Sequence, residues 1–228
     1  SSATKVTVSG LSTSTAEDTV TINNLAVGTT IAMSDATDLD VNANFVTAAT
    51  SGTADSVSIA LNGVGSTADN DTTLKVSDGF ETYNISSTGS ASTIDQITAS
   101  STAGVTTINV TGDANLTFRP KAGLDATLDV LDASAFTGNL SFATTDDASS
   151  PDGTTNGVDV LDLTVTGGSG NDTIVTANAT GNEISIDGGA GDDSVTIVAT
   201  PVAGTSTKAG DSLKGGAGTD TLIADIDL

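Results

Sequence analysis

Three glycine-aspartate segments of this chain have the residue types and the spacing of a cation site. They read GGSGNDTIV from Gly167, GGAGDDSVT from Gly188 and GGAGTDTLI from Gly215. Each matches the nonapeptide G-G-x-G-x-D-x-U-x, in which U is apolar. Glycine permits positive φ and close backbone approach, so carbonyl oxygens can converge, and aspartate adds a hard anionic oxygen. The sequence therefore predicts calcium-binding loops.

We expect the calcium ligands to be backbone oxygens of the loop glycines together with the acidic and amide side chains behind them. Asp211 belongs to this set because it stands at the ligand position of a degenerate nonapeptide, STKAGDSLK. The apolar U positions are expected to face the core, and they are Ile174, Val195 and Leu222. The candidate metal residues are Gly168, Gly170, Asn171, Asp172, Gly189, Gly191, Asp192, Asp193, Asp211, Gly216, Gly218 and Asp220.

The spacing of the three loops indicates how they are arranged. Their first residues are 188 − 167 = 21 and 215 − 188 = 27 residues apart, rather than nine as in a tandem array. In the nonapeptide before Gly188, Ile186 fills the core position, but Ile184 stands where the aspartate is expected. We therefore expect each turn to contain one complete loop, a strand, a degenerate loop on the opposite side and a returning strand. The complete loops then stack on one edge, with an ion between neighbours and Asp193 shared by two ions.

The aspartates of such a stack would repel one another. Like charges about 5 Å apart repel by about 3 kcal/mol at an effective dielectric constant of about 20. A ladder of Asp172, Asp193 and Asp220, with Asp192 beside it, would then oppose folding without an ion. Calcium that binds only the folded state stabilises it by about 2.7 kcal/mol at a hundredfold excess over its Kd. We expect the C-terminal third to be β-rich with calcium and disordered or molten without it.

Other acidic groups give weaker predictions. Asp69 and Asp71 flank Asn70 in a turn-like segment, and Asp187 precedes the second loop. Because surface turns rich in Asp and Asn usually bind water, we expect solvation rather than an ion at Asp69 to Asp71. Asp187 is either a secondary calcium ligand or a solvated strand residue, and we expect the latter.

The residue types exclude most catalytic sites. The chain has no histidine and no cysteine, which excludes a Ser-His-Asp triad, a thiol nucleophile and an H-E-x-x-H zinc site. A β-helical carbohydrate enzyme based on paired carboxylates is the remaining alternative. Arg119 is the single arginine, and aromatic residues are 3% of the chain, which leaves few platforms for sugar stacking. We expect no enzymatic activity.

Short alternating runs such as KVTVSG, LDLTVTGG and NEISID would position these loops. Gly, Asn, Asp or Ser bounds each run, which is typical of short strands between tight turns. An apolar-Asn/Asp-apolar triplet also recurs at steps of 109 − 84 = 25, 132 − 109 = 23 and 162 − 132 = 30 residues. Steps of this size predict an all-β parallel β-helix with a ladder of stacked amides. The triplets centre on Asp40, Asn84, Asn109, Asp132 and Asp162.

Composition and charge agree with a thin solenoid. The 228 residues are rich in small and β-branched types, which can close a narrow core. The 29 acidic and six basic residues give a formal charge of -23, which repels nucleic acid and attracts divalent cations. Because the chain has no cysteine to form disulfide bonds, we expect bound metal to supply the additional stability. The apolar runs are too short for a transmembrane segment, and a start at Ser1 without Met is expected of a processed product or a fragment.

With its nonapeptides, the sequence resembles the repeats-in-toxin (RTX) calcium-binding proteins, in which two nonapeptides form each turn of a parallel β-roll. Upstream, TTINVTGDANLTF and LDASAFTGNLSF resemble the β-solenoid repeats of bacterial S-layer proteins. The likeness covers roughly residues 55 to 228. It implies a parallel β-helix that ends in a calcium-binding β-roll, with calcium between loops on the same side.

The resemblance also implies a function. It implies a secreted, extracellular structural protein that packs with copies of itself in a bacterial surface layer, with calcium ordering the subunit and enabling assembly. The alternative is a stalk or adhesive segment of a large type I-secreted adhesin, and cell-surface polysaccharide is a second candidate partner. We expect a β-rich segment over residues 1–54, which is either continuous with the solenoid or a small separate β-module, then solenoid rungs over 55–150 and the calcium-binding roll over 151–228.

Overall fold

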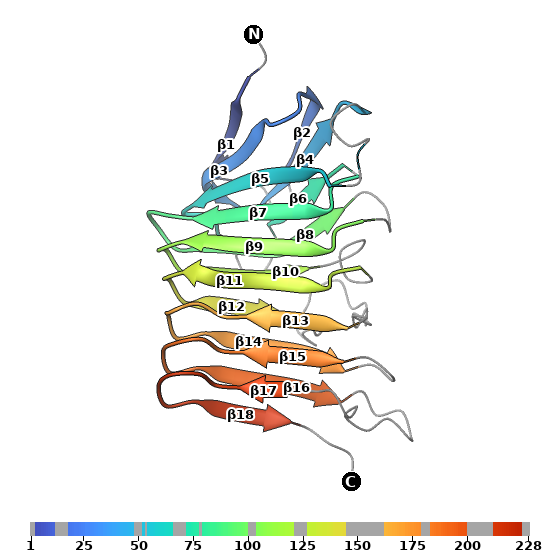
Figure 1. The fold of residues 1–228 in the computed structure, drawn as a ribbon. Coiled ribbons are helices and arrows are strands. Elements are labelled where there is room, and N and C mark those ends of the chain that lie inside the picture. Colours follow the sequence, from blue (N-terminus) through green and yellow to red (C-terminus); the bar gives the residue numbers. More distant parts are fainter. Residues whose placement is uncertain are drawn as a thin grey trace.

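The computed structural model is a parallel β-solenoid, which confirms the predicted fold class (Figure 1). The chain alternates between two nine-stranded parallel sheets, so that each turn contributes one strand to each sheet. Among the residues that the structure describes, no helix has the length and hydropathy needed to cross a bilayer. The described residues are 3–11, 18–47, 52, 54–65, 72–77, 79–99, 104–120, 127–144, 162–178, 183–199 and 212–224.

The odd-numbered strands form one sheet and the even-numbered strands the other. The first sheet contains β1 (Lys5–Leu11), β3 (Thr30–Thr37), β5 (Ser56–Asn62), β7 (Thr82–Ser87), β9 (Thr107–Gly112), β11 (Val130–Phe136), β13 (Leu163–Thr166), β15 (Ile184–Asp187) and β17 (Ser212–Lys214). The second contains β2 (Asp18–Leu25), β4 (Leu39–Phe45), β6 (Thr73–Val76), β8 (Ser92–Ala99), β10 (Leu116–Pro120), β12 (Leu140–Ala143), β14 (Thr173–Asn178), β16 (Ser194–Ala199) and β18 (Thr221–Ala224).

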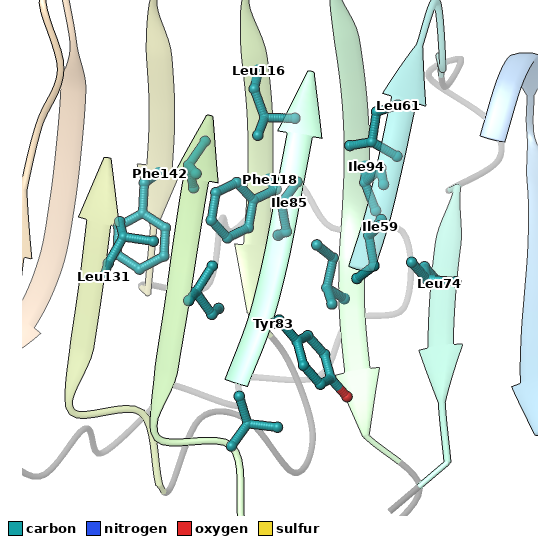
Figure 2. Packing of buried hydrophobic residues seen from close by; sticks show 14 of the residues in the cluster. Ile59, Leu61, Leu74, Tyr83, Ile85, Ile94, Leu116, Phe118, Leu131 and Phe142 are labelled. Carbon is teal, nitrogen blue, oxygen red and sulfur yellow. The ribbon is translucent and has the colours of Figure 1, made fainter. Parts of the chain in front are cut away.

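Strand alternation places one row of apolar side chains from each sheet in a shared core. In the second sheet Ile94, Phe118 and Phe142 are in register and fully buried. The rings of Phe118 and Phe142 lie 5.3 Å apart, and Figure 2 shows both among the aliphatic side chains of the core. Because structurally equivalent residues of successive turns stack on one another, a thin hydrophobic core runs continuously along the molecule.

Strands β1 to β4 lie in the same two sheets as the later strands. β3 pairs in parallel with β5, and β4 with β6, so the strands of residues 5–45 continue directly into those that follow. The expected boundary at residues 150 and 151 lies outside the described residues.

The expected amide ladder exists for part of its length. Asn84 and Asn109 are in register, and the Asn109 Nδ2 donates to Asn84 Oδ1 at 2.9 Å. Asp132 is next in the row, where it accepts the backbone N–H of Ser134.

The prediction was wrong for two other residues of the ladder. Asp162 precedes β13, and the residue in register with Asp132 is Thr166. Asp40 lies on β4 in the opposite sheet. Because loop lengths differ between turns, a recurring triplet at similar steps along the chain does not guarantee the same register.

Candidate metal centre

The three glycine-aspartate loops stack on one edge of the solenoid, as predicted. Each joins an odd strand to the following even strand, at the turns on the left of Figure 1. Thr173, Ser194 and Thr221, which follow the three loop aspartates, are in parallel register. Ala190 and Ala217, inside the second and third loops, also form a parallel bridge.

The loop glycines allow the stacked backbones to approach closely. An added Cβ on Gly168 would collide with the carbonyl oxygen of Phe136, and one on Gly170 with that of Gly138. The same holds for a Cβ on Gly191 against Gly170. Carbonyl oxygens of one turn therefore lie directly against the glycines of the next. Positive φ angles occur at Gly189 (+99°), Gly191 (+125°), Gly216 (+104°) and Gly218 (+142°).

The loop aspartates form an inner ladder of hydrogen bonds. The Leu140 N–H donates to Asp172 Oδ1 at 2.8 Å, and the Asp172 N–H donates to Asp193 Oδ1 at 2.8 Å. In the next turn the Asp193 N–H donates to Asp220 Oδ1 at 3.0 Å. Each carboxylate therefore accepts the N–H of the equivalent position one turn earlier.

Two of these carboxylates are deeply buried. Asp172 is 1% exposed and Asp193 is 2% exposed. Burial raises the pKa of Asp172, and the Asp193 charge raises it further against the two backbone hydrogen bonds. Burial also raises the pKa of Asp193, and the nearby charges of Asp220, Asp192 and Asp187 add to this effect. Both side chains thus lie where a bound cation would favour the ionised form.

The two buried aspartates differ in how their second oxygen is satisfied. Asp172 Oδ2 accepts the N–H of Gly168 at 2.8 Å. Asp193 Oδ2 is buried and has no hydrogen-bond partner among the described residues. It lies beside the Gly188 backbone, where an added Cβ would be 2.5 Å from it. A buried carboxylate oxygen without a partner is costly, and a cation would remove that cost.

A second, outer ladder runs beside the first in the opposite sense. The oxygen of each side chain accepts the N–H of the equivalent residue in the next turn, at 2.8 to 2.9 Å. This places the predicted ligands Asn171 and Asp192 on an exposed hydrogen-bonded column. The column consists of Asn115, Asn139, Asn171, Asp192 and Thr219.

Sequence reasoning missed Asn115 and Asn139, although both directly precede a leucine at the start of an even strand. In register, Leu116 and Leu140 correspond to Asp172, so Asn115 and Asn139 match Asn171, and aligning these leucines with the loop aspartates would have identified both.

The remaining predicted positions have mixed outcomes. Ile174 and Val195 are buried in the core as predicted. Leu222 is 46% exposed, because β18 is the last strand of its sheet and no described strand covers its outer side. Asp211, and the cluster of Asp69 to Asp71, lie outside the described residues.

Within the described part of the chain, no three acidic side chains gather into a metal-ligating group. An ion in the loop stack would therefore need backbone carbonyl oxygens in addition to a carboxylate. Calcium accepts such mixed, all-oxygen coordination in flexible geometry. The closely stacked backbone carbonyls and Asp193 Oδ2, which has no hydrogen-bond partner among the described residues, are oxygen donors of this type, so the residues present fit calcium.

No protein-family model matches this sequence, and no match was found among curated proteins or solved structures. The likeness to the RTX proteins therefore rests on the nonapeptide motifs, and calcium binding stays a prediction.

Proposed function

We propose that this chain is a secreted structural β-solenoid that binds calcium in its loop stack and packs with copies of itself in a bacterial surface layer. The observation that carries the proposal is the buried carboxylate of Asp193, which lies inside a stack of glycine loops and has one oxygen without a hydrogen-bond partner among the described residues. This observation supports calcium ordering of the subunit, and the resemblance of the motifs supports the surface layer.

The role of calcium is electrostatic at two levels. Inside the stack, the ion offsets the buried charge of Asp193 and the charges of Asp192 and Asp220 close to it. On the surface, a chain with a formal charge of -23 repels its copies, and divalent cations reduce that repulsion. Calcium would thus favour both folding and contact between subunits.

A structural role fits the architecture better than a catalytic one. Without histidine or cysteine, the chain cannot form a Ser-His-Asp triad or a thiol nucleophile, and paired carboxylates are the remaining catalytic option. A solenoid with a continuous core and two long sheet faces offers an extended rigid body, which suits a lattice subunit.

The test is imaging of the purified full chain by electron microscopy in calcium, in chelator and in an equal concentration of magnesium. Ordered sheets or tubes in calcium alone support the surface layer. Dispersed rods that bind calcium favour the alternative, a stalk or adhesive segment of a secreted adhesin. Absence of calcium binding by calorimetry contradicts the proposal as a whole.

A further inference from the structure

The three glycine-aspartate loops share a sequence pattern but not a backbone conformation. The second glycine has positive φ in the second and third loops, at Gly189 (+99°) and Gly216 (+104°). The equivalent Gly168 of the first loop does not adopt positive φ. The first loop therefore directs its peptide groups differently from the other two.

The first and second loops also differ in which carboxylate receives the N–H of the second glycine. In the first loop the Gly168 N–H donates to Asp172 Oδ2, within the same loop, at 2.8 Å. In the second loop the Gly189 N–H instead donates to Asp187 Oδ1 at 3.2 Å. The equivalent oxygen of Asp193 is left without a partner among the described residues.

The alternative acceptor exists only in the second loop. Thr166, Asp187 and Lys214 are in parallel register, each directly before the first glycine of its loop. Threonine and lysine offer no carboxylate at that position. Lys214 Nζ lies 3.9 Å from Asp187 Oδ2, but both side chains are exposed, so this ion pair holds Asp187 only weakly.

We propose that Asp187 is a positioning residue for calcium: it takes the Gly189 N–H and so leaves Asp193 Oδ2 free to bind the ion. The first loop, which has Thr166 in place of Asp187, is a hydrogen-bonded junction to the preceding turns, and Asp172 is a structural acceptor there. This inference rests on the proposed calcium binding and assigns unequal roles to loops that look alike in sequence.

The hydrogen bonds of the first loop support its role as a junction to the preceding turn. Asp172 accepts the Leu140 N–H from a turn whose own loop has no aspartate. The Ser169 N–H donates to the Phe136 carbonyl at 2.9 Å in the same direction. With both oxygens of Asp172 already bonded to backbone N–H groups, this loop needs no cation to be satisfied.

The first test is calorimetric titration of the full chain with calcium chloride, comparing Asp187→Ala with Asp187→Asn. Asparagine keeps the Oδ1 acceptor and removes the charge, whereas alanine removes both. Loss of an orienting partner next to a metal ligand weakens metal affinity by about 10–100-fold, and we expect this loss for alanine. Asparagine should weaken binding much less. Equal losses in both variants, or unchanged affinity in alanine, overturn the positioning role.

The second test is a gain of function in the first loop. Thr166→Asp introduces an acceptor in register with Asp187, which should draw the Gly168 N–H away from Asp172. We expect this variant to bind one calcium ion more per chain than the wild type, with circular dichroism in calcium as the folding control. An unchanged number of ions in folded Thr166→Asp overturns the inference, whereas a wild type that binds no calcium overturns the proposed function instead.

Discussion

The backbone N–H of Asp172 donates to Asp193 Oδ1 across successive turns at 2.8 Å. This bond, repeated between Asp193 and Asp220, means that every step of the acidic ladder is also a step of a hydrogen-bonded ladder. Charge-assisted bonds of this kind are stronger than neutral ones. They offset part of the repulsion expected from charges alone, and the cost concentrates at Asp193, where one oxygen has no partner among the described residues.

The pH dependence of thermal stability, measured in a calcium chelator, tests whether burial of the Asp193 carboxylate destabilises the fold. Burial raises the pKa of Asp193 above its usual 3.8, so the folded state binds a proton more readily than the unfolded chain. The resulting stability is fully present below pH 3.8 and is lost as pH rises through the raised pKa. We therefore expect Tm in chelator to rise as pH falls from 7 towards 4.

Asp193→Asn is the matched control for that experiment, because it removes the titrating group and keeps the side-chain shape. Its Tm should rise less on acidification than that of the wild type. If both proteins respond identically, the buried carboxylate is not the source of the pH dependence. In saturating calcium the sign should reverse for the wild type, since protons then compete with the ion.

The close approach of stacked loops predicts unequal costs for two glycine substitutions. Gly28 has φ of +75° with open space around an added Cβ, so Gly28→Ala should cost about 1–2 kcal/mol from backbone strain alone. Gly191 has φ of +125°, and its added Cβ would also collide with the Gly170 carbonyl. Gly191→Ala should cost clearly more. Thermal unfolding in calcium measures both, and equal shifts in Tm would show that the loops are not closely stacked.

The narrow core predicts a large effect of one aromatic truncation. Phe118 is fully buried and packs on Phe142, so Phe118→Ala should lower the free energy of unfolding by about 3–5 kcal/mol. The neighbouring Thr117, on the opposite face of the strand, is the control, and Thr117→Ala should change it by less than about 0.5 kcal/mol. Urea unfolding in calcium gives both values. Similar midpoints for the two variants would mean that the aromatic layer contributes little.

Much of the fold could be predicted because its repeating unit is local. A glycine turn followed by alternating apolar residues specifies a strand and its inward face, which is why Ile174 and Val195 were placed correctly. The stacking of Asn84 on Asn109 followed from the same alternation. Register over longer distances depends on loop length, and Asp162 was therefore assigned to a row in which Thr166 stands.

The candidate site was predictable in its membership but not in its hydrogen bonds. The nonapeptides identified Asp172 and Asp193 as equivalent, and in the stack they do occupy equivalent positions. They differ in whether the N–H of the second glycine bonds to the loop aspartate, and Gly168 and Gly189 also differ in the sign of φ. Residue types do not encode these bonds, so the sequence could suggest Asp187 only as a secondary ligand or a solvated residue, and not the positioning role that we propose for it.

Hydrogen exchange of the full chain, in saturating calcium and in chelator, tests the central claim most directly. The Ser194 and Thr221 amides donate to the Asp172 and Asp193 carbonyls of the preceding turn, so they report on the stack. We predict that their protection falls by about 100-fold in chelator, which corresponds to about 2.7 kcal/mol of calcium stabilisation, while amides of β9 change little. Equal protection of Ser194 and Thr221 in the two conditions would contradict calcium binding in this stack.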